Sequence, residues 1–192
     1  MQHGYRHQLR AMTRADHARL DALFSALDIT RRVDYAHFVG VHLAVFEVLQ
    51  RHLAPASLTR RQLLAGLACL QRDLATLGER RAPMRHRPAG HDAADGLDPL
   101  AVDYVVAGSR LGLKVLQARW ASSSDPLVRA AGAYFTLSNV APAWPKVCRA
   151  LSQVPPDSAR AGAITRDTKR IFDLFAVIYR RGRPLITDRT AQ

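Results

Sequence analysis

One histidine is spaced as a ligand for a cofactor would be. In a helix, His17 lies on one stripe with Thr13, Leu20 and Phe24. Neutral imidazole is a good donor to heme iron, so axial ligation is one interpretation of this position. A half-buried core histidine with one satisfied nitrogen is the other. Arg10 precedes His17 by seven residues, about 10 Å along a helix, which suits a cation that meets a heme propionate.

Two glycines are the second unusual feature. Gly108 and Gly112 are four residues apart inside a predicted helix over residues 104–116, where each glycine costs about 1 kcal/mol relative to alanine. Close packing of two helices is one explanation. The alternative is that bare backbone approaches a flat ligand and that a kink bends the helix over it. A histidine on a facing helix would then complete a site for a planar macrocycle.

Other patterns for catalysis or metal binding are missing from the sequence. It contains no GxSxG, HExxH or GK[ST] phosphate-binding motif. Asp16 and Asp21 flank His17 but are expected to point off its stripe, so they predict no catalytic carboxylate pair. Cys69 and Cys148 stand alone, which disfavours a disulfide framework or a zinc site and favours a reducing, cytoplasmic location.

The hydrophobic pattern predicts helices and no strands. Apolar residues recur every three or four positions, without an alternating segment. The predicted helices cover about residues 13–27, 34–53, 63–77 and 104–116, and the last begins near residue 165. In that last helix four residues are expected to face inward, namely Ile171, Leu174, Phe175 and Ile178.

Three sequence patterns mark predicted helix starts. Thr59 and Gln62 have the spacing of a capping box. Asp98-Pro99 and Asp125-Pro126 each predict an N-cap residue followed by proline at the first helical position.

Length and charge narrow the class of protein. The 192 residues fit one domain over 1–192, with a core at about 7–181 and flexible tails at 1–6 and 182–192. No apolar run approaches the roughly 20 residues of a membrane-spanning helix, and the N-terminus lacks the apolar core of a signal peptide. The net charge of +12 suits nucleic acid, an anionic membrane surface or an acidic protein.

A basic run in the segment 80–96 could contact phosphates, or could be a solvated connection. The arginines are spread over every segment, without the spacing of a helix-turn-helix motif, so we expect neither nucleic acid nor a membrane as a partner.

Two segments together resemble the heme oxygenase family. Residues 9–17, LRAMTRADH, are similar to its first-helix motif, in which a basic residue, a threonine and the iron-ligating histidine keep this spacing. Residues 104–116, YVVAGSRLGLKVL, are similar to its distal-helix motif, as found in the bacterial enzymes that occur beside phytochromes. Residues 133–140 and the Phe172/Phe175 helix fit later segments more loosely. The resemblance implies an all-α, single-domain bundle that holds heme between a proximal (first) helix and a distal helix.

The resemblance also implies an activity. Heme oxygenases open heme to biliverdin and release CO and ferrous iron, using O₂ and reducing equivalents, so heme is substrate and cofactor at once. The iron ligand would be His17, and the catalytic positions would be Gly108, Ser109 and Gly112. The heme-binding positions would be Arg10, Thr13, Tyr104, Leu113, Phe135, Lys146 and Arg149. Arg10, Lys146 and Arg149 would hold the propionates.

The expected partners follow from the same resemblance. They are an acidic electron donor, such as a ferredoxin or a flavoprotein reductase, and a phytochrome that accepts biliverdin.

Three positions depart from the family pattern. Ser109 stands where some members have an aspartate, and we expect ordered water to suffice there. Leu113 replaces a second glycine, and Ala107 replaces an acidic residue. These two changes leave open a heme-binding carrier of the same fold that does not degrade heme. A basic helical nucleic-acid binder is a third hypothesis.

Overall fold

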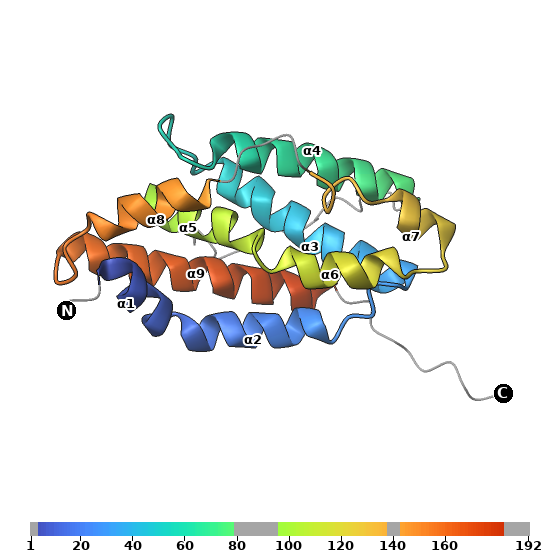
Figure 1. The fold of residues 1–192 in the computed structure, drawn as a ribbon, viewed down its shortest axis with the longest axis horizontal. Helices are drawn as coiled ribbons and strands as arrows, with labels where there is room; N and C mark the ends of the chain where they lie inside the picture. The colour runs from blue at the N-terminus through green and yellow to red at the C-terminus, as the bar shows by residue number, and fades with distance from the viewer. Residues whose placement is uncertain (1–3, 79–95, 138–142, 183–192) are drawn as a thin grey trace.

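The structure is a computed structural model that describes residues 4–78, 96–137 and 143–182. Within these ranges the secondary structure is helical and contains no strand, as the sequence predicted. The helices, shown in Figure 1, are α1 (Tyr5–Met12), α2 (Arg14–Ser25), α3 (Arg32–Gln50), α4 (Arg60–Thr76), α5 (Pro99–Ser109), α6 (Leu113–Ala121), α7 (Pro126–Ala130), α8 (Trp144–Ser152) and α9 (Ala159–Gly182). The segment 80–96, with its basic run, lies outside the described residues, except for Gly96 at its end.

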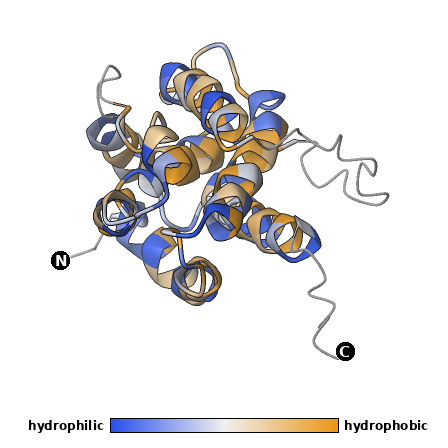
Figure 2. Cartoon of the chain, turned by 90° about the vertical axis from the view of Figure 1, so that its right-hand side faces the viewer, coloured by the Kyte–Doolittle hydropathy of each residue, from blue (hydrophilic) through white to orange (hydrophobic). Residues whose placement is uncertain are grey.

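The long helix α9 is the element on which the others are arranged. It packs against α1, α2, α3 and α5, while α4 covers α3, and α8 covers α5 and α1. Viewed along the bundle, the apolar faces of the helices turn toward its interior (Figure 2). No helix in the described part of the chain combines the length and the apolar character needed to cross a membrane.

The start of α9 differs from the prediction, whereas its inward face agrees with it. All four residues predicted to face inward are buried. The helix begins at Ala159 rather than near residue 165, because the Ser158 hydroxyl accepts a hydrogen bond from the Ala161 amide at 3.1 Å and caps the first turn. That turn holds alanines and a glycine, which leave no large apolar residues to reveal its periodicity.

The helix predicted over about residues 13–27 is α2, but the continuous helix expected from Arg10 to His17 is interrupted at Thr13, where α1 ends. The Thr13 hydroxyl donates to the Leu9 carbonyl at 2.8 Å, and such back-bonding bends helices. Upstream, α1 begins at Tyr5, whose buried hydroxyl donates to the Ala161 carbonyl at 2.6 Å. Tyr5 and Arg6 therefore belong to α1 and not to the flexible tail predicted at 1–6. Residues 1–3 lie outside the described ranges.

The capping box predicted at Thr59 is wrong, because a carboxylate of another helix takes the place of the Gln62 side chain. Asp103 of α5 is buried and accepts hydrogen bonds from the Thr59 amide at 3.0 Å and the Thr59 hydroxyl at 2.6 Å. It also accepts from the Leu58 amide at 3.0 Å and the Ser57 hydroxyl at 2.6 Å. Gln62 instead donates to the Val106 carbonyl of α5 at 2.7 Å. The start of α4 is thus fixed by α5, a contact between residues over 40 positions apart.

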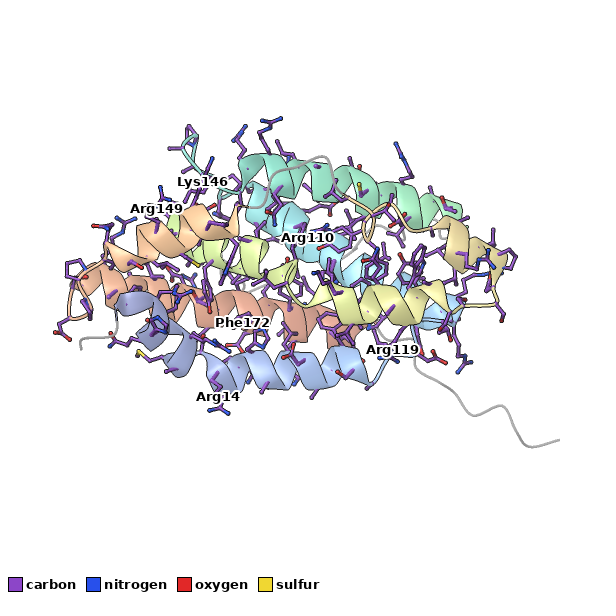
Figure 3. The ribbon with its side chains drawn as sticks, viewed as in Figure 1. Arg14, Arg110, Arg119, Lys146, Arg149 and Phe172 are labelled. Atoms are coloured by element: carbon purple, nitrogen blue, oxygen red, sulfur yellow. The ribbon has the colours of Figure 1, made fainter. Side chains whose placement is uncertain are left out.

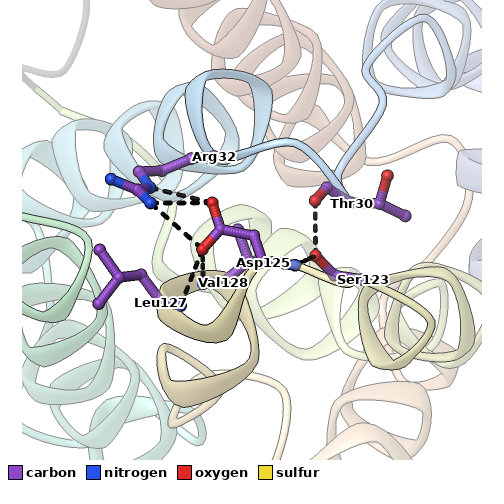
Figure 4. Close-up of polar contacts among 6 residues, drawn as sticks. All are labelled: Thr30, Arg32, Ser123, Asp125, Leu127 and Val128. Carbon is purple, nitrogen blue, oxygen red and sulfur yellow. Dashed lines mark hydrogen bonds and ion pairs between the residues drawn. The ribbon is translucent and has the colours of Figure 1, made fainter.

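Both predicted aspartate caps are confirmed. The Asp98 side chain accepts from the Leu100 amide, and the Asp125 side chain accepts from the amides of Leu127 and Val128. Asp125 also pairs with Arg32 of α3 at 3.0 Å, so the short helix α7 is tied to α3 (Figure 4). The caps are local features, which is why the sequence sufficed to predict them.

The predicted helix over residues 104–116 is interrupted. α5 ends at Ser109 and α6 begins at Leu113, with a turn at residues 110–112 that we call the elbow. Gly112 is the N-cap residue of α6 and does not lie in a helix interior. The expected kink is therefore a break between two helices.

Candidate ligand site between α2 and α6

Two contacts connect α2 with the α5–α6 segment. At the start of α2, the Thr13 side chain acts on the Tyr104 phenol and opposes the rise of its pKa. Beyond its end, the Arg119 guanidinium of α6 donates to the Leu27 carbonyl at 2.9 Å, and Arg119 lies between the two helices in Figure 3. Both segments run in the same direction from the first contact to the second. The chain segments from Thr13 to Leu27 and from Tyr104 to Arg119 therefore run in parallel on one side of the bundle.

On the α2 side, this stretch carries the stripe predicted from the sequence. Thr13 and Phe24 are buried at its two ends, and Leu20 is half-buried. His17 lies between them, yet 61% of its side chain is exposed. It is therefore not the half-buried core histidine of the alternative interpretation. The histidine stands on an apolar stripe but remains open to a ligand.

The contacts of His17 leave one ring nitrogen for a ligand. Its Nδ1 lies 2.8 Å from an Asp21 carboxylate oxygen. An exposed pair of this kind adds little stability. When Nδ1 donates its hydrogen to a carboxylate, however, the lone pair that can bind a metal is on Nε2. The edge of the Phe172 ring of α9 meets the His17 ring, with 5.7 Å between ring centroids. The ring is thus oriented by two neighbours, and Nε2 is the atom that can ligate a metal.

Asp21 is the residue that the sequence analysis misjudged. It was expected to point away from the stripe of His17, and the structure brings it to Nδ1. The spacing of four residues on one helix could have revealed the contact, since such residues are neighbours.

The helix α6, which Arg119 connects to the end of α2, presents an exposed, small and apolar surface. Gly112 and Val115 precede Arg119 by seven and four residues and so share its helix face. Val115 is 70% exposed, and a Cβ placed on Gly112 would meet no other atom within 4 Å. We call His17, Leu20, Gly112 and Val115 the α2–α6 patch.

Gly108 has a different neighbour. A Cβ placed on Gly108 would lie 3.5 Å from the Trp144 ring of α8, at ordinary contact distance. The same tryptophan packs against the Tyr104 ring, with centroids 5.6 Å apart. Gly108 therefore has the helix-packing role of the first explanation, and Gly112 is the glycine that leaves open space.

Arg10 and Tyr104 lie together at the Thr13 end of the patch. Burial raises the pKa of Tyr104, while the Thr13 side chain and the charge of the nearby Arg10 oppose that rise. Arg10 itself is exposed. Ser109, at the other end of α5, donates its hydroxyl hydrogen to the Val106 carbonyl at 2.9 Å. Thus Arg10, Thr13 and Tyr104, from two separate sequence motifs, form one cluster.

Four predicted heme-binding positions do not join this cluster. Leu113 and Phe135 are buried in the core, where the Phe135 ring stacks on Tyr35 at 5.8 Å. Lys146 and Arg149 are exposed on the side of α8 that faces away from α2 in Figure 3. The structure does not bring these four side chains to His17.

A search of the chain against protein-family models finds no match, and no curated protein matches it. The arrangement of the patch itself is therefore the basis for a functional conclusion.

Proposed function

We propose that this protein is a heme oxygenase that opens heme to biliverdin with release of CO and ferrous iron, using O₂ and reducing equivalents. The observation that carries this proposal is the exposed His17 ring, held through Nδ1 by Asp21. Gly112, at the start of α6, supports it, because a Cβ there would meet no other atom. A flat, apolar ligand with a metal at its centre suits this combination of one imidazole, aliphatic side chains and a position without a side chain.

In this proposal the residues of the chain bind and orient the ligand. Heme supplies the iron that activates O₂ when it is bound. His17 would ligate the metal through Nε2, while Asp21 and the Phe172 edge limit rotation of the imidazole. Gly112 keeps the facing surface free of side-chain atoms, so that the backbone can approach the ring.

Arg10 is the cation best placed for the anionic edge of such a ligand. Its charge acts on Tyr104, as the Thr13 side chain does. Thr13 precedes His17 by four residues. A guanidinium forms charge-assisted hydrogen bonds with carboxylates, so Arg10 would bind a propionate. Lys146 and Arg149 face away from this end and are not included in the proposed site.

The two departures that favoured a carrier do not lie on the patch. Leu113 and Ala107 are both buried, so neither side chain narrows the exposed stretch. We therefore propose catalysis over storage. The net charge of +12 supports an acidic electron donor such as a ferredoxin or a flavoprotein reductase, and a phytochrome is the proposed acceptor of biliverdin.

Spectroscopy with hemin tests this function. The purified protein is mixed with hemin, and then with a reductant and O₂, while absorption is followed from 350 to 750 nm. The proposal predicts a Soret band that decays as biliverdin absorption rises. A Soret band that persists under these conditions would mean a carrier, and no band at all would exclude both heme-dependent functions.

A further inference from the structure

Most of the elbow has few contacts of its own. The Leu111 side chain is 57% exposed, and a Cβ placed on Gly112 would meet no other atom within 4 Å. In the backbone, the Leu111 amide donates to the Gly108 carbonyl at 2.9 Å, and the Leu113 amide donates to the Arg110 carbonyl at 3.4 Å, which is long for a hydrogen bond. Leu111 and Gly112 therefore contribute little to fixing the place of the elbow.

Arg110 connects the elbow to a distant part of the chain. Its guanidinium donates through Nη1 to the Tyr134 carbonyl at 2.7 Å and through Nη2 to the Leu137 carbonyl at 2.8 Å. The same guanidinium lies 5.5 Å from the centroid of the Tyr134 ring. Because a guanidinium is planar and presents its donors in a rigid fork, bonds to two carbonyls define both its position and its direction.

The segment that accepts these bonds is itself held by α4. The buried Asp73 carboxylate of α4 accepts hydrogen bonds from the amides of Ala133 at 2.8 Å and Tyr134 at 2.9 Å. The hydroxyl and the amide of Thr136 both donate to the Gly132 carbonyl, at 2.8 and 3.0 Å. We call residues 132–137 the platform. Arg110 is thus bound to a segment that has its own fixed support.

We propose that Arg110 is a positioning residue that fixes the elbow on the platform and so determines where Gly112 and the start of α6 lie. Gly112 follows Arg110 by two residues, so a shift of the elbow moves the glycine of the α2–α6 patch. A surface that is held in place before a ligand arrives avoids the cost of ordering it on binding. The effect on ligand binding rests on the proposed heme oxygenase function, whereas the anchoring of the elbow does not.

Hydrogen exchange in the protein without hemin tests the anchor. A hydrogen bond from a charged donor shifts an equilibrium by roughly 10- to 150-fold, so Arg110→Ala should speed exchange of the amides of residues 111–116 at least about tenfold. Arg110→Lys should be intermediate, because lysine lacks the fork that reaches both carbonyls. Amides in the middle of α9 should change much less. An unchanged rate at the elbow, or an equal increase in α9, would overturn the proposal.

Arg119→Ala is the matched control. Arg119 also donates to a backbone carbonyl, that of Leu27 at 2.9 Å, but it does so from the other end of α6. We expect faster exchange at the end of α6 and an unchanged rate at the elbow. Equally fast exchange at the elbow in both variants would mean that α6 as a whole holds the elbow, and would overturn the assignment to Arg110.

Hemin titration tests the effect on ligand binding. Arg110→Ala should bind hemin roughly tenfold more weakly, as expected for the loss of one such hydrogen bond, with the Soret maximum unchanged because His17 is intact. Guanidinium ion, added below its denaturing concentration, should restore affinity in Arg110→Ala but not in Gly112→Leu. A general loss of stability would not be rescued in this way.

Unchanged hemin affinity in Arg110→Ala, or weaker affinity without rescue, would remove the role of Arg110 toward the ligand. A wild-type protein that does not bind hemin would remove the proposed function together with that role, while hydrogen exchange would still decide whether Arg110 anchors the elbow.

Discussion

Gly112→Leu separates ligand binding from folding at the elbow. A Cβ at Gly112 meets nothing within 4 Å, so a leucine side chain there would project over the α2–α6 patch and cause no clash in the protein itself. A bound macrocycle would have to share that space. Overpacking of this kind costs about 1–3 kcal/mol, which corresponds to a loss of hemin affinity of roughly 5- to 150-fold.

Gly108→Leu is the matched control. A Cβ at Gly108 is already in contact with the Trp144 ring at 3.5 Å, so the larger side chain must push against α8. There the same cost of about 1–3 kcal/mol falls on folding, and for a chain of this size it lowers the melting temperature by about 2–12 °C.

Hemin titration and thermal unfolding of both variants check this contrast. Gly112→Leu should unfold like the wild type and bind hemin more weakly, whereas Gly108→Leu should unfold at a lower temperature. If Gly112→Leu binds and degrades hemin as the wild type does, the assignment of the ligand to this face is refuted.

Three further predictions concern the fold, its pH dependence and the electron donor. Asp103→Ala leaves the buried amide of Thr59 and the part-buried amide of Leu58 without their acceptor, at about 1–3 kcal/mol each. Urea unfolding should therefore show a loss of about 2–6 kcal/mol, and Asp103→Asn should lose less; equal stability of all three proteins would contradict the capping role. Burial lowers the pKa of His42 to about 4, below its usual value near 6.5. On acidification the unfolded chain therefore binds the proton first, and the free energy of unfolding should fall by about 3 kcal/mol as the pH drops from 6.5 to 4. In urea unfolding, His42→Gln should remove this pH dependence, and an unchanged slope would argue against a buried neutral imidazole. Turnover with an acidic ferredoxin should decrease as salt rises, because screening weakens charge steering, and salt-independent turnover at constant heme affinity would mean that the +12 charge does not guide the donor.

Features determined by neighbouring residues could be predicted from the sequence. The helical periodicity, the inward face of α9 and the aspartate caps of α5 and α7 each depend on residues a few positions apart. The spacing of Thr13 and His17 likewise predicted that both lie on one stripe with Leu20 and Phe24.

Features that depend on tertiary contacts could not be predicted. The start of α4 is capped by Asp103, more than 40 residues later, and a capping box within the sequence was the natural local alternative. The core position of Phe135 depends on its stack with Tyr35, about 100 residues earlier. The outward direction of Lys146 and Arg149 depends on which face of α8 packs against α1 and α5.

The exposure of His17 also depends on tertiary contacts that the sequence does not reveal. Its place among apolar residues left both a half-buried core histidine and an axial ligand open, and the structure leaves 61% of its side chain exposed. Periodicity tells which face of a helix a residue occupies, but not whether another element closes over that face.

Ligation of heme iron by His17 is the central claim, and the hemin spectrum of His17→Ala tests it most directly. His7→Ala is the control, because His7 is also exposed and lies on the adjoining helix α1. Since His17 is exposed, its truncation should leave thermal unfolding of the hemin-free protein unchanged. The account predicts that His17→Ala shifts or loses the Soret band, that added imidazole restores it, and that His7→Ala keeps the wild-type spectrum. A wild-type Soret band and wild-type heme degradation in His17→Ala would contradict the account.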